Sequence, residues 1–174
     1  MAAGRNLSVL PGVIHLRPFS NADFAELHRI DNVCFTQGIA YSKSELRYYL
    51  YHPRSFTVVA ETAEQVIAGF CTGQAQMREG KPFGHIITID VLPEWRRQEV
   101  GRTLLRSVEE GFRARSAELV RLEVAVDNLQ AQGFYHAMGY VSIGKIRGYY
   151  GGKLDALVME KDLTADALRP QQHS

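Results

Sequence analysis

The chain has 174 residues, of which 45 % are hydrophobic and 22 % are charged. Domains usually contain about 100–200 residues, so we expect one domain with a complete hydrophobic core. The formal net charge is only +1 at pH 7, which argues against the strongly basic face that a nucleic-acid-binding protein needs. We therefore expect no nucleic acid among its partners.

The two ends and the cysteines indicate the compartment. The N-terminus has no apolar run of signal-peptide length, and no stretch approaches the roughly 18 apolar residues of a membrane span. Cys34 and Cys71 form no CxxC pair and are expected to be buried and reduced. The six histidines lack metal-ligand spacing. We predict a cytoplasmic protein with no metal and no membrane partner. Its expected organisation is a flexible leader over 1–11, one domain over 12–163 and a flexible tail over 164–174.

Helix start signals and alternating hydrophobicity organise the first half of the chain. Ser20 and Asp23 form an S-x-x-D start signal, and Ser42 and Glu45 form a full S-x-x-E capping box. The expected elements are a strand over 13–19, helices over about 24–35 and 42–51, and strands over 55–61, 65–77 and 85–91, with a turn-rich connection over 78–84.

The second half predicts two more helices and three more strands. Asn128 is suited to cap the start of a short helix, and Gly139 is suited to end it. The expected elements are a helix over about 100–115, a strand over 118–126, a helix over 128–138 and a closing hairpin of strands over 140–150 and 153–163. The order predicts an α/β fold with a mixed sheet of about seven strands and about four helices, antiparallel at first and with a parallel crossover in its second half.

One loop has the features of an anion site. Residues 93–105 read PEWRRQEVGRTLL, a turn with arginines between a strand and a helix. The first amide groups of a helix have no partner inside it, and the helix dipole favours negative charge there. The loop lacks the GK[ST] ending of a P-loop, and GxGxxG is absent. The residues alone leave two interpretations open, an anion site or a solvated basic helix start.

A wider comparison of motifs favours the anion site. The stretch IDVLPEWRRQEVGRTLL resembles the acetyl-CoA pyrophosphate loop of the GNAT N-acetyltransferase superfamily, whose pattern is [QR]-x-x-G-x-[GA]. Arg96, Glu99 and Gly101 occupy its first, fourth and sixth positions. Residues 122–140 (LEVAVDNLQAQGFYHAMGY) resemble the superfamily's fifth strand and following helix. Residues 147–163 (RGYYGGKLDALVMEKDL) resemble the closing hairpin of its ribosomal-protein N-alpha-acetyltransferase branch.

The resemblance implies a single-domain GNAT fold that binds acetyl-CoA where the fourth and fifth strands splay apart. The backbone around Ile89 to Val91 is implied to pair with the pantetheine, and the backbone amides from Arg97 to Arg102 are implied to hold the pyrophosphate. The residues so implied to bind the cofactor are Ile89, Val91, Arg96, Arg97, Gln98, Glu99, Val100, Gly101, Arg102, Thr103 and Asn128.

Glu99 departs from the pattern because the superfamily has glycine at this position. A left-handed backbone costs a non-glycine residue about 1–2 kcal/mol, and a carboxylate repels a diphosphate. Two interpretations follow. Either the side chain points to water, flanked by Arg96 and Arg102, and the backbone still binds the cofactor, or the site is weakened or repurposed.

Glu123 is the candidate general base for acyl transfer from a thioester to an amine. Leu122 and Val124 lie on one face of its strand, so Glu123 points to the other. A carboxylate in a covered strand is unusual unless it lines a cleft. The alternative is a structural carboxylate paired with Arg121 or Arg147. The resemblance places Glu123 at the catalytic glutamate of the ribosomal-protein branch.

The remaining site residues are expected around Glu123. Asp90 is the second candidate for the base. Tyr135 is implied to protonate the departing thiolate, and its alternative role is that of a core aromatic residue. The residues expected at the acceptor groove are Tyr41, Tyr149 and Tyr150.

The predicted activity is acetyl transfer from acetyl-CoA to a primary amine, by direct attack in a ternary complex. The expected acceptor is the N-terminal α-amine of a protein or peptide. One alternative is a small amine, such as a polyamine, an amino acid or an antibiotic. Another is a non-catalytic acyl-CoA sensor, for which Glu99 is the argument. The expected oligomeric state is a monomer or a homodimer.

Overall fold

The computed structural model describes residues 13–36 and 38–165. The helices are α1 (Phe24–Cys34), α2 (Lys43–Tyr51), α3 (Val100–Arg113) and α4 (Leu129–Ala137), with short 3₁₀ turns at Asn21–Asp23 and Pro93–Trp95. The strands are β1 (Ile14–Pro18), β2 (Ser55–Thr62), β3 (Ile67–Arg78), β4 (Lys81–Val91), β5 (Leu119–Ala125), β6 (Val141–Tyr150) and β7 (Leu154–Asp162). The order of elements is the one that the sequence predicts. The leader over 1–11 and the tail beyond residue 165 lie outside the described residues.

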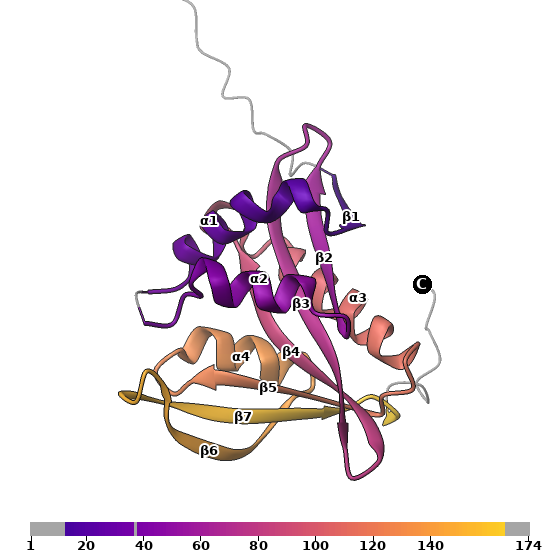
Figure 1. The fold of residues 1–174 in the computed structure, drawn as a ribbon, viewed down its shortest axis with the longest axis vertical. Coiled ribbons are helices and arrows are strands. Elements are labelled where there is room, and N and C mark those ends of the chain that lie inside the picture. The colour runs from indigo at the N-terminus through magenta and orange to yellow at the C-terminus, as the bar shows by residue number, and fades with distance from the viewer. Residues whose placement is uncertain (1–12, 37, 166–174) are drawn as a thin grey trace, which may run out of the picture.

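All seven strands form one sheet in the order β1-β2-β3-β4-β5-β7-β6. Neighbouring strands are antiparallel except for β4 and β5, which are parallel. Figure 1 shows the two groups of strands that this junction joins, β1–β4 and β5–β7. The prediction of a mixed, mostly antiparallel sheet with one parallel crossover is confirmed.

The predicted start signals act at the first two helices. The Ser20 backbone N–H donates to Asp23 Oδ2 at 2.8 Å, and this box opens the 3₁₀ turn that leads into α1. At α2 the box is reciprocal: Glu45 N donates to Ser42 Oγ, and Ser42 N donates to Glu45 Oε2 at 2.9 Å. Local sequence therefore places both helices that cover one face of the sheet.

The expected connection over 78–84 is wrong, because β4 begins at Lys81 and pairs with β3 from its first residue. Only Glu79 and Gly80 form the turn, and both have a positive φ, 51° and 76°. Two such residues make the tight turn that suits the twist of a hairpin. Pro82 hid this strand from the sequence pattern; it lies next to the turn of the hairpin, opposite Met77.

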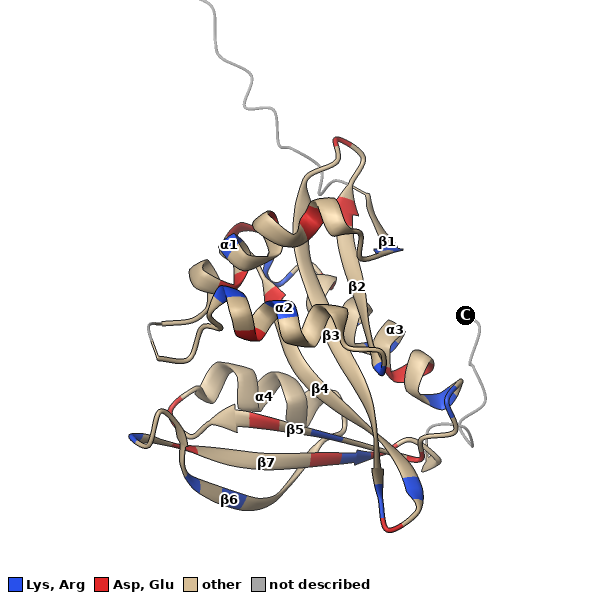
Figure 2. Cartoon of the chain, in the orientation of Figure 1, with Lys and Arg blue, Asp and Glu red and all other residues tan. Residues whose placement is uncertain are grey.

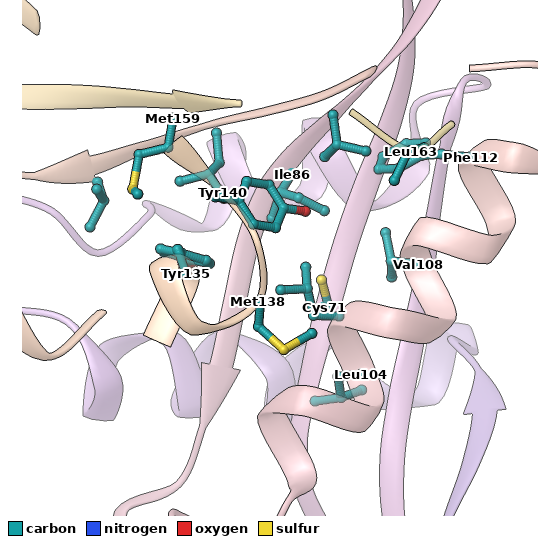
Figure 3. Close-up of a cluster of buried hydrophobic side chains, with 14 of the residues drawn as sticks. Cys71, Ile86, Leu104, Val108, Phe112, Tyr135, Met138, Tyr140, Met159 and Leu163 are labelled. Carbon is teal, nitrogen blue, oxygen red and sulfur yellow. The ribbon is translucent and has the colours of Figure 1, made fainter. Parts of the chain in front are cut away.

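Two hydrophobic cores lie on opposite faces of the sheet. On one face α1 and α2 contribute Leu27, Ile30, Leu46 and Leu50. On the other, α3 and α4 pack against β3, β4, β5 and β7. Figure 3 shows this second core, which includes Cys71, Ile86, Leu104, Val108, Phe112, Tyr135, Met138, Tyr140, Met159 and Leu163. Helices thus cover both faces of the sheet, and its strand pairing is shortest at the junction of β4 and β5.

The surface carries charges of both signs. In Figure 2 both basic and acidic residues occur on α2, β5 and β7. Within residues 13–36 and 38–165, no helix is long and apolar enough to cross a membrane.

Candidate active site

The central feature of the site is the divergence of β4 and β5. In the described chain their pairing is limited to Gly84 with Val120 and His85 with Arg121. The register between β3 and β4 then shifts by one residue, so that Ile87 is an extra residue in β4. Such a bulge bends a strand and increases its twist. The β4 backbone beyond His85 therefore faces β5 without forming a ladder, as the predicted splay requires (Figure 1).

Glu123 lies beside this divergence, and its side chain is only 8 % exposed. Its two oxygens accept hydrogen bonds from His85 Nε2 at 2.6 Å and from Arg121 Nε at 3.2 Å. Burial raises the pKa of Glu123, but the bonds from His85 and Arg121 outweigh it, so the pKa falls below its usual value. Glu123 is therefore an ionised carboxylate that faces the open part of the sheet.

The sequence left open that Glu123 is a structural carboxylate paired with Arg121. In the structure Glu123 does pair with Arg121, and it also lies beside the divergence of β4 and β5. Arg147 does not appear among the partners of Glu123 in the described part of the chain. A carboxylate held by a cation can both stabilise the fold and accept a proton. Its catalytic role stays a prediction.

His85 is a site residue that the sequence reasoning missed. Its Nδ1 lies 3.1 Å from Gln76 Nε2, and its Nε2 lies 2.6 Å from Glu123. With Gln76 as assigned, the amide donates to Nδ1, so the imidazole N–H is on Nε2 and points at Glu123. The only signal in the sequence is a lone histidine at the expected start of the fourth strand, and its partner is 38 positions away.

Tyrosines from two parts of the chain gather near Glu123. The Tyr41 hydroxyl donates a hydrogen bond to Ile87 O at 3.2 Å. The centroid of its ring lies 5.3 Å from that of Tyr49 on α2. Tyr149 and Tyr150 of β6 form an edge-to-face pair at 4.9 Å. Burial, and then the charge of Glu123, raise the pKa of Tyr149, and the same two causes raise that of Tyr150 to about 12. The charge of Glu123 thus acts on Tyr49, Tyr149 and Tyr150, and Tyr41 joins this group through its ring contact with Tyr49.

Tyr135 lies on α4 with 7 % of its surface exposed, within the core formed with α3. Its ring packs against Phe134 and Tyr140. Burial raises its pKa, so the hydroxyl stays protonated at neutral pH, as a proton donor must. The packing fits the alternative of a core aromatic residue, and the role as an acid stays a prediction.

Asp90, the second candidate for the base, is not beside Glu123. It is 1 % exposed and its Oδ1 accepts from Thr88 Oγ1 at 2.6 Å. Burial, followed by the charge of Asp31, raises its pKa well above the usual value. A carboxyl group that is protonated and enclosed cannot take a proton from a substrate, so Asp90 does not suit the role of base.

The loop before α3 has a strained backbone. Glu99 is the N-cap of α3 with φ 65°, and Arg97 has φ 58°. The Glu99 side chain is 74 % exposed and pairs with Arg102 at 3.0 Å. Glu99 therefore points to solvent, as the first interpretation of this residue expects. Two left-handed non-glycine residues in one loop are costly, and such strain is often found at functional sites.

Several predicted cofactor residues already make hydrogen bonds within the protein. The first helical bond runs from Thr103 N to Glu99 O at 2.9 Å, and the Thr103 hydroxyl donates to the same oxygen. Val91 O accepts from Arg96 Nε at 2.9 Å. Asn128 Oδ1 caps α4 by accepting from Ala131 N at 3.1 Å. These bonds fix the turn before α3 and the start of α4, and the binding role of these residues stays a prediction.

The start of α3 suits a diphosphate. The amides of Val100, Gly101 and Arg102 precede the first helical bond, so they point out of the helix end. A Cβ at Gly101 would meet Phe134 of α4 at 3.5 Å and Val91 of β4 at 3.7 Å, which places this turn against the end of β4 and against the helix that follows β5. Ile89 and Val91 are half-buried on the same side. The residues present therefore fit a CoA diphosphate, and in the described chain no three His, Cys, Asp or Glu residues gather as a metal would require.

Comparison with known proteins gives one family. Residues 24–140 match the model of the acetyltransferase (GNAT) family. An uncharacterized N-acetyltransferase of Methanocaldococcus jannaschii is 31 % identical over 147 residues, covering 84 % of this chain and 90 % of the relative.

Two further proteins extend the likeness. A putative ribosomal protein bS18-alanine N-acetyltransferase of Bacillus subtilis is 31 % identical over 140 residues, covering 76 % of this chain and 89 % of its own length. The crystal structure of Naa20 from Chaetomium thermophilum in complex with a bisubstrate analogue is 27 % identical, with a TM-score of 0.75 and 92 % of each chain covered.

Proposed function

This chain belongs to the GNAT family of acetyltransferases, and on that premise we propose that it acetylates the N-terminal α-amine of a protein or peptide. It is an N-acetyltransferase, and acetyl-CoA supplies the acetyl group. The observation that carries the proposal is the ionised Glu123, buried where β4 and β5 diverge and faced by tyrosines of two separate elements.

The chemistry of an α-amine fits this site. A free α-amine has a pKa near 7.7–8, whereas a lysine amine has a pKa near 10.4. Glu123 has a lowered pKa, so it is a mild base that can take a proton from an α-amine but is poorly matched to lysine. His85 and Arg121 hold the carboxylate in place.

Each residue then has one role. The amine nitrogen bonds to the acetyl carbon as the carbon–sulfur bond breaks. Glu123 takes the amine proton, directly or through a water, and Tyr135 gives a proton to the departing sulfur. A backbone amide of β4 near the Ile87 bulge stabilises the carbonyl oxygen. Tyr41, Tyr149 and Tyr150 contact the first residues of the acceptor.

The names of several relatives support a protein acceptor. The Bacillus subtilis relative is named for alanine of a ribosomal protein, and an Arabidopsis thaliana relative is named as the catalytic subunit of an N-terminal acetyltransferase complex. The exposed Glu99 removes the main argument for a sensor, because its carboxylate is paired with Arg102.

The test is acetylation of matched peptides. Each peptide has a free α-amine and one internal lysine, its control is the same peptide with the α-amine formylated, and spermidine represents small amines. We expect CoA release with the free peptide, acetyl on the α-amine by mass spectrometry, and background rates with the control. Lysine acetylation of the control, or a higher kcat/KM for spermidine, would contradict the proposal.

A further inference from the structure

Asp31 on α1 and Asp90 on β4 are buried carboxyl groups that face each other between α1 and the sheet. They are 0 % and 1 % exposed. Asp31 Oδ2 accepts from Tyr41 N at 2.7 Å, and Asp90 Oδ1 accepts from Thr88 Oγ1 at 2.6 Å. The two remaining oxygens, Asp31 Oδ1 and Asp90 Oδ2, are buried and have no other hydrogen-bond partner among the described residues.

A single proton resolves this arrangement. Two ionised carboxylates in contact repel each other, and a buried acceptor without a donor is costly. If Asp90 Oδ2 carries a proton, it donates to Asp31 Oδ1 and all four oxygens are satisfied. Asp31 is then the ionised partner, because the Tyr41 N–H stabilises its charge. Burial raises the pKa of Asp31 to about 6, and burial and the charge of Asp31 raise that of Asp90 well above its usual value.

The pair is connected to the acceptor side through Tyr41. Asp31 fixes the backbone of Tyr41, and the hydroxyl of Tyr41 bonds to Ile87 O at the bulge of β4. Asp90 lies three residues further along the same strand. Helix α1, Tyr41 and β4 are therefore joined at one point, close to where the acceptor amine meets the acetyl group.

We propose that Asp31 and Asp90 share one proton and act as positioning residues that hold Tyr41 on the acceptor side of β4. This inference rests on the proposed function, which places the acceptor beside Tyr41. At alkaline pH the shared proton leaves, the two carboxylates repel, and Tyr41 loses its fixed position. Acceptor binding then weakens, whereas the loop before α3 keeps its shape.

Few other groups near the pair change charge at neutral to alkaline pH. The titratable and charged groups around it are His28, Cys34, Tyr41, Glu45, Cys71, Arg96 and Tyr135. Burial raises the pKa of Cys34 to about 11 and those of the other thiol and the two tyrosines above their usual ranges, so all four stay neutral to about pH 9. Arg96 stays charged, and Glu45 has a pKa lowered by bonds from Ser42. His28 needs a control.

Three variants separate the possibilities. Asp90→Asn keeps both hydrogen bonds, since its amide donates to Asp31 and accepts from Thr88, but it has no proton to lose. Asp31→Ala removes the acceptor for Tyr41 N. His28→Gln is the control for titration of the neighbouring histidine. Two readouts are measured from pH 6.5 to 9.5: the hydrogen exchange rate of the Tyr41 amide, and the KM values for an acceptor peptide and for acetyl-CoA.

Asp31→Ala should speed exchange at Tyr41 and raise the peptide KM about tenfold, with the acetyl-CoA KM within about twofold, because it removes one charged hydrogen bond. In the native protein both readouts should rise at alkaline pH relative to Asp90→Asn at the same pH, and His28→Gln should follow the native protein. The α-amine of the peptide titrates equally in every variant, so it cancels from this comparison.

Parallel pH profiles in the native protein and Asp90→Asn, for exchange and KM alike, would overturn the shared proton. Unchanged exchange at Tyr41 in Asp31→Ala would overturn the positioning role. If exchange changes as expected but the peptide KM does not, the pair holds Tyr41 and the proposed place of the acceptor is wrong. The exchange readout needs no acceptor, so failure of the proposed function is distinguishable from failure of this inference.

Discussion

Two carboxyl groups on the neighbouring strands β5 and β4, Glu123 and Asp90, have opposite ionisation states. Both are shielded from solvent. Glu123 faces His85 and Arg121, and its pKa is lowered. Asp90 faces Asp31, and its pKa is raised. Burial alone raises the pKa of both groups, so the charge of the partner decides which carboxyl is a base and which is a hydrogen-bond donor.

The two carboxyl groups therefore suit different tasks, proton transfer for Glu123 and the positioning of neighbouring elements for Asp90. The ionised carboxyl lies beside the divergence of β4 and β5, where the proposed function places the acceptor amine. The protonated carboxyl lies beneath α1, where no substrate reaches it and a shared proton can only hold elements together. Four changes test this division, from the largest expected effect to the smallest.

Glu123→Gln should lower kcat by about 10²-fold or more, because it removes the base and keeps the shape of the side chain. Steady-state kinetics with a peptide acceptor measure this. The control is Glu160→Gln, a carboxylate on β7 that bonds to Arg78 and should change kcat less than about twofold. Equal effects of the two changes would mean that Glu123 is a structural ion-pair partner.

The stability difference between Asp90→Asn and the native protein should grow as the pH rises. A carboxyl whose pKa is raised on folding contributes stability that is present below its unfolded pKa near 4 and is lost as the pH rises through its folded pKa. Burial and the charge of Asp31 raise the pKa of Asp90, so the native protein loses this contribution as the pH rises, whereas Asp90→Asn has no such proton to lose. Urea unfolding at several pH values measures it. A constant difference would mean that the pair binds no extra proton.

His85→Ala should move the acid limb of the kcat/KM profile to higher pH. The hydrogen bond from His85 lowers the pKa of Glu123 and so counteracts the effect of burial. Without it the pKa of Glu123 rises, so the loss of activity relative to the native protein should be larger at pH 6 than at pH 8. His85→Gln keeps a donor and should restore part of the shift. An unmoved limb would indicate that Arg121 alone sets the ionisation of Glu123.

Glu99→Gly should have the smallest effect. The left-handed conformation and the exposed ion pair with Arg102 are present before the cofactor binds, so removing them changes stability more than affinity, and the Glu99 carboxylate points to solvent. Titration calorimetry with acetyl-CoA should therefore show a gain in affinity of only a few-fold. A gain of a hundredfold would mean that the carboxylate obstructs the diphosphate, and the sensor hypothesis would regain support.

The sequence determined the local elements and one end of the site. Helix starts follow from local hydrogen bonding, because each cap and its partner lie within four residues of one another. The examples are the capping boxes at Ser20 and Ser42 and the N-cap at Asn128. The anion-binding turn before α3 is likewise local. The connection over 78–84 was misjudged because Pro82 disfavours a strand in the sequence pattern but is tolerated at the end of a hairpin.

Only the tertiary structure decided which side chains meet. His85 and Glu123 are 38 positions apart, Tyr41 reaches the Ile87 carbonyl across 46, and Asp31 meets Asp90 across the interface between a helix and the sheet. No local pattern records such pairs, because they depend on strand order and on a single bulge. For the same reason the sequence offered both Glu123 and Asp90 as bases. The ionisation of a carboxyl group depends on the charges that folding places beside it.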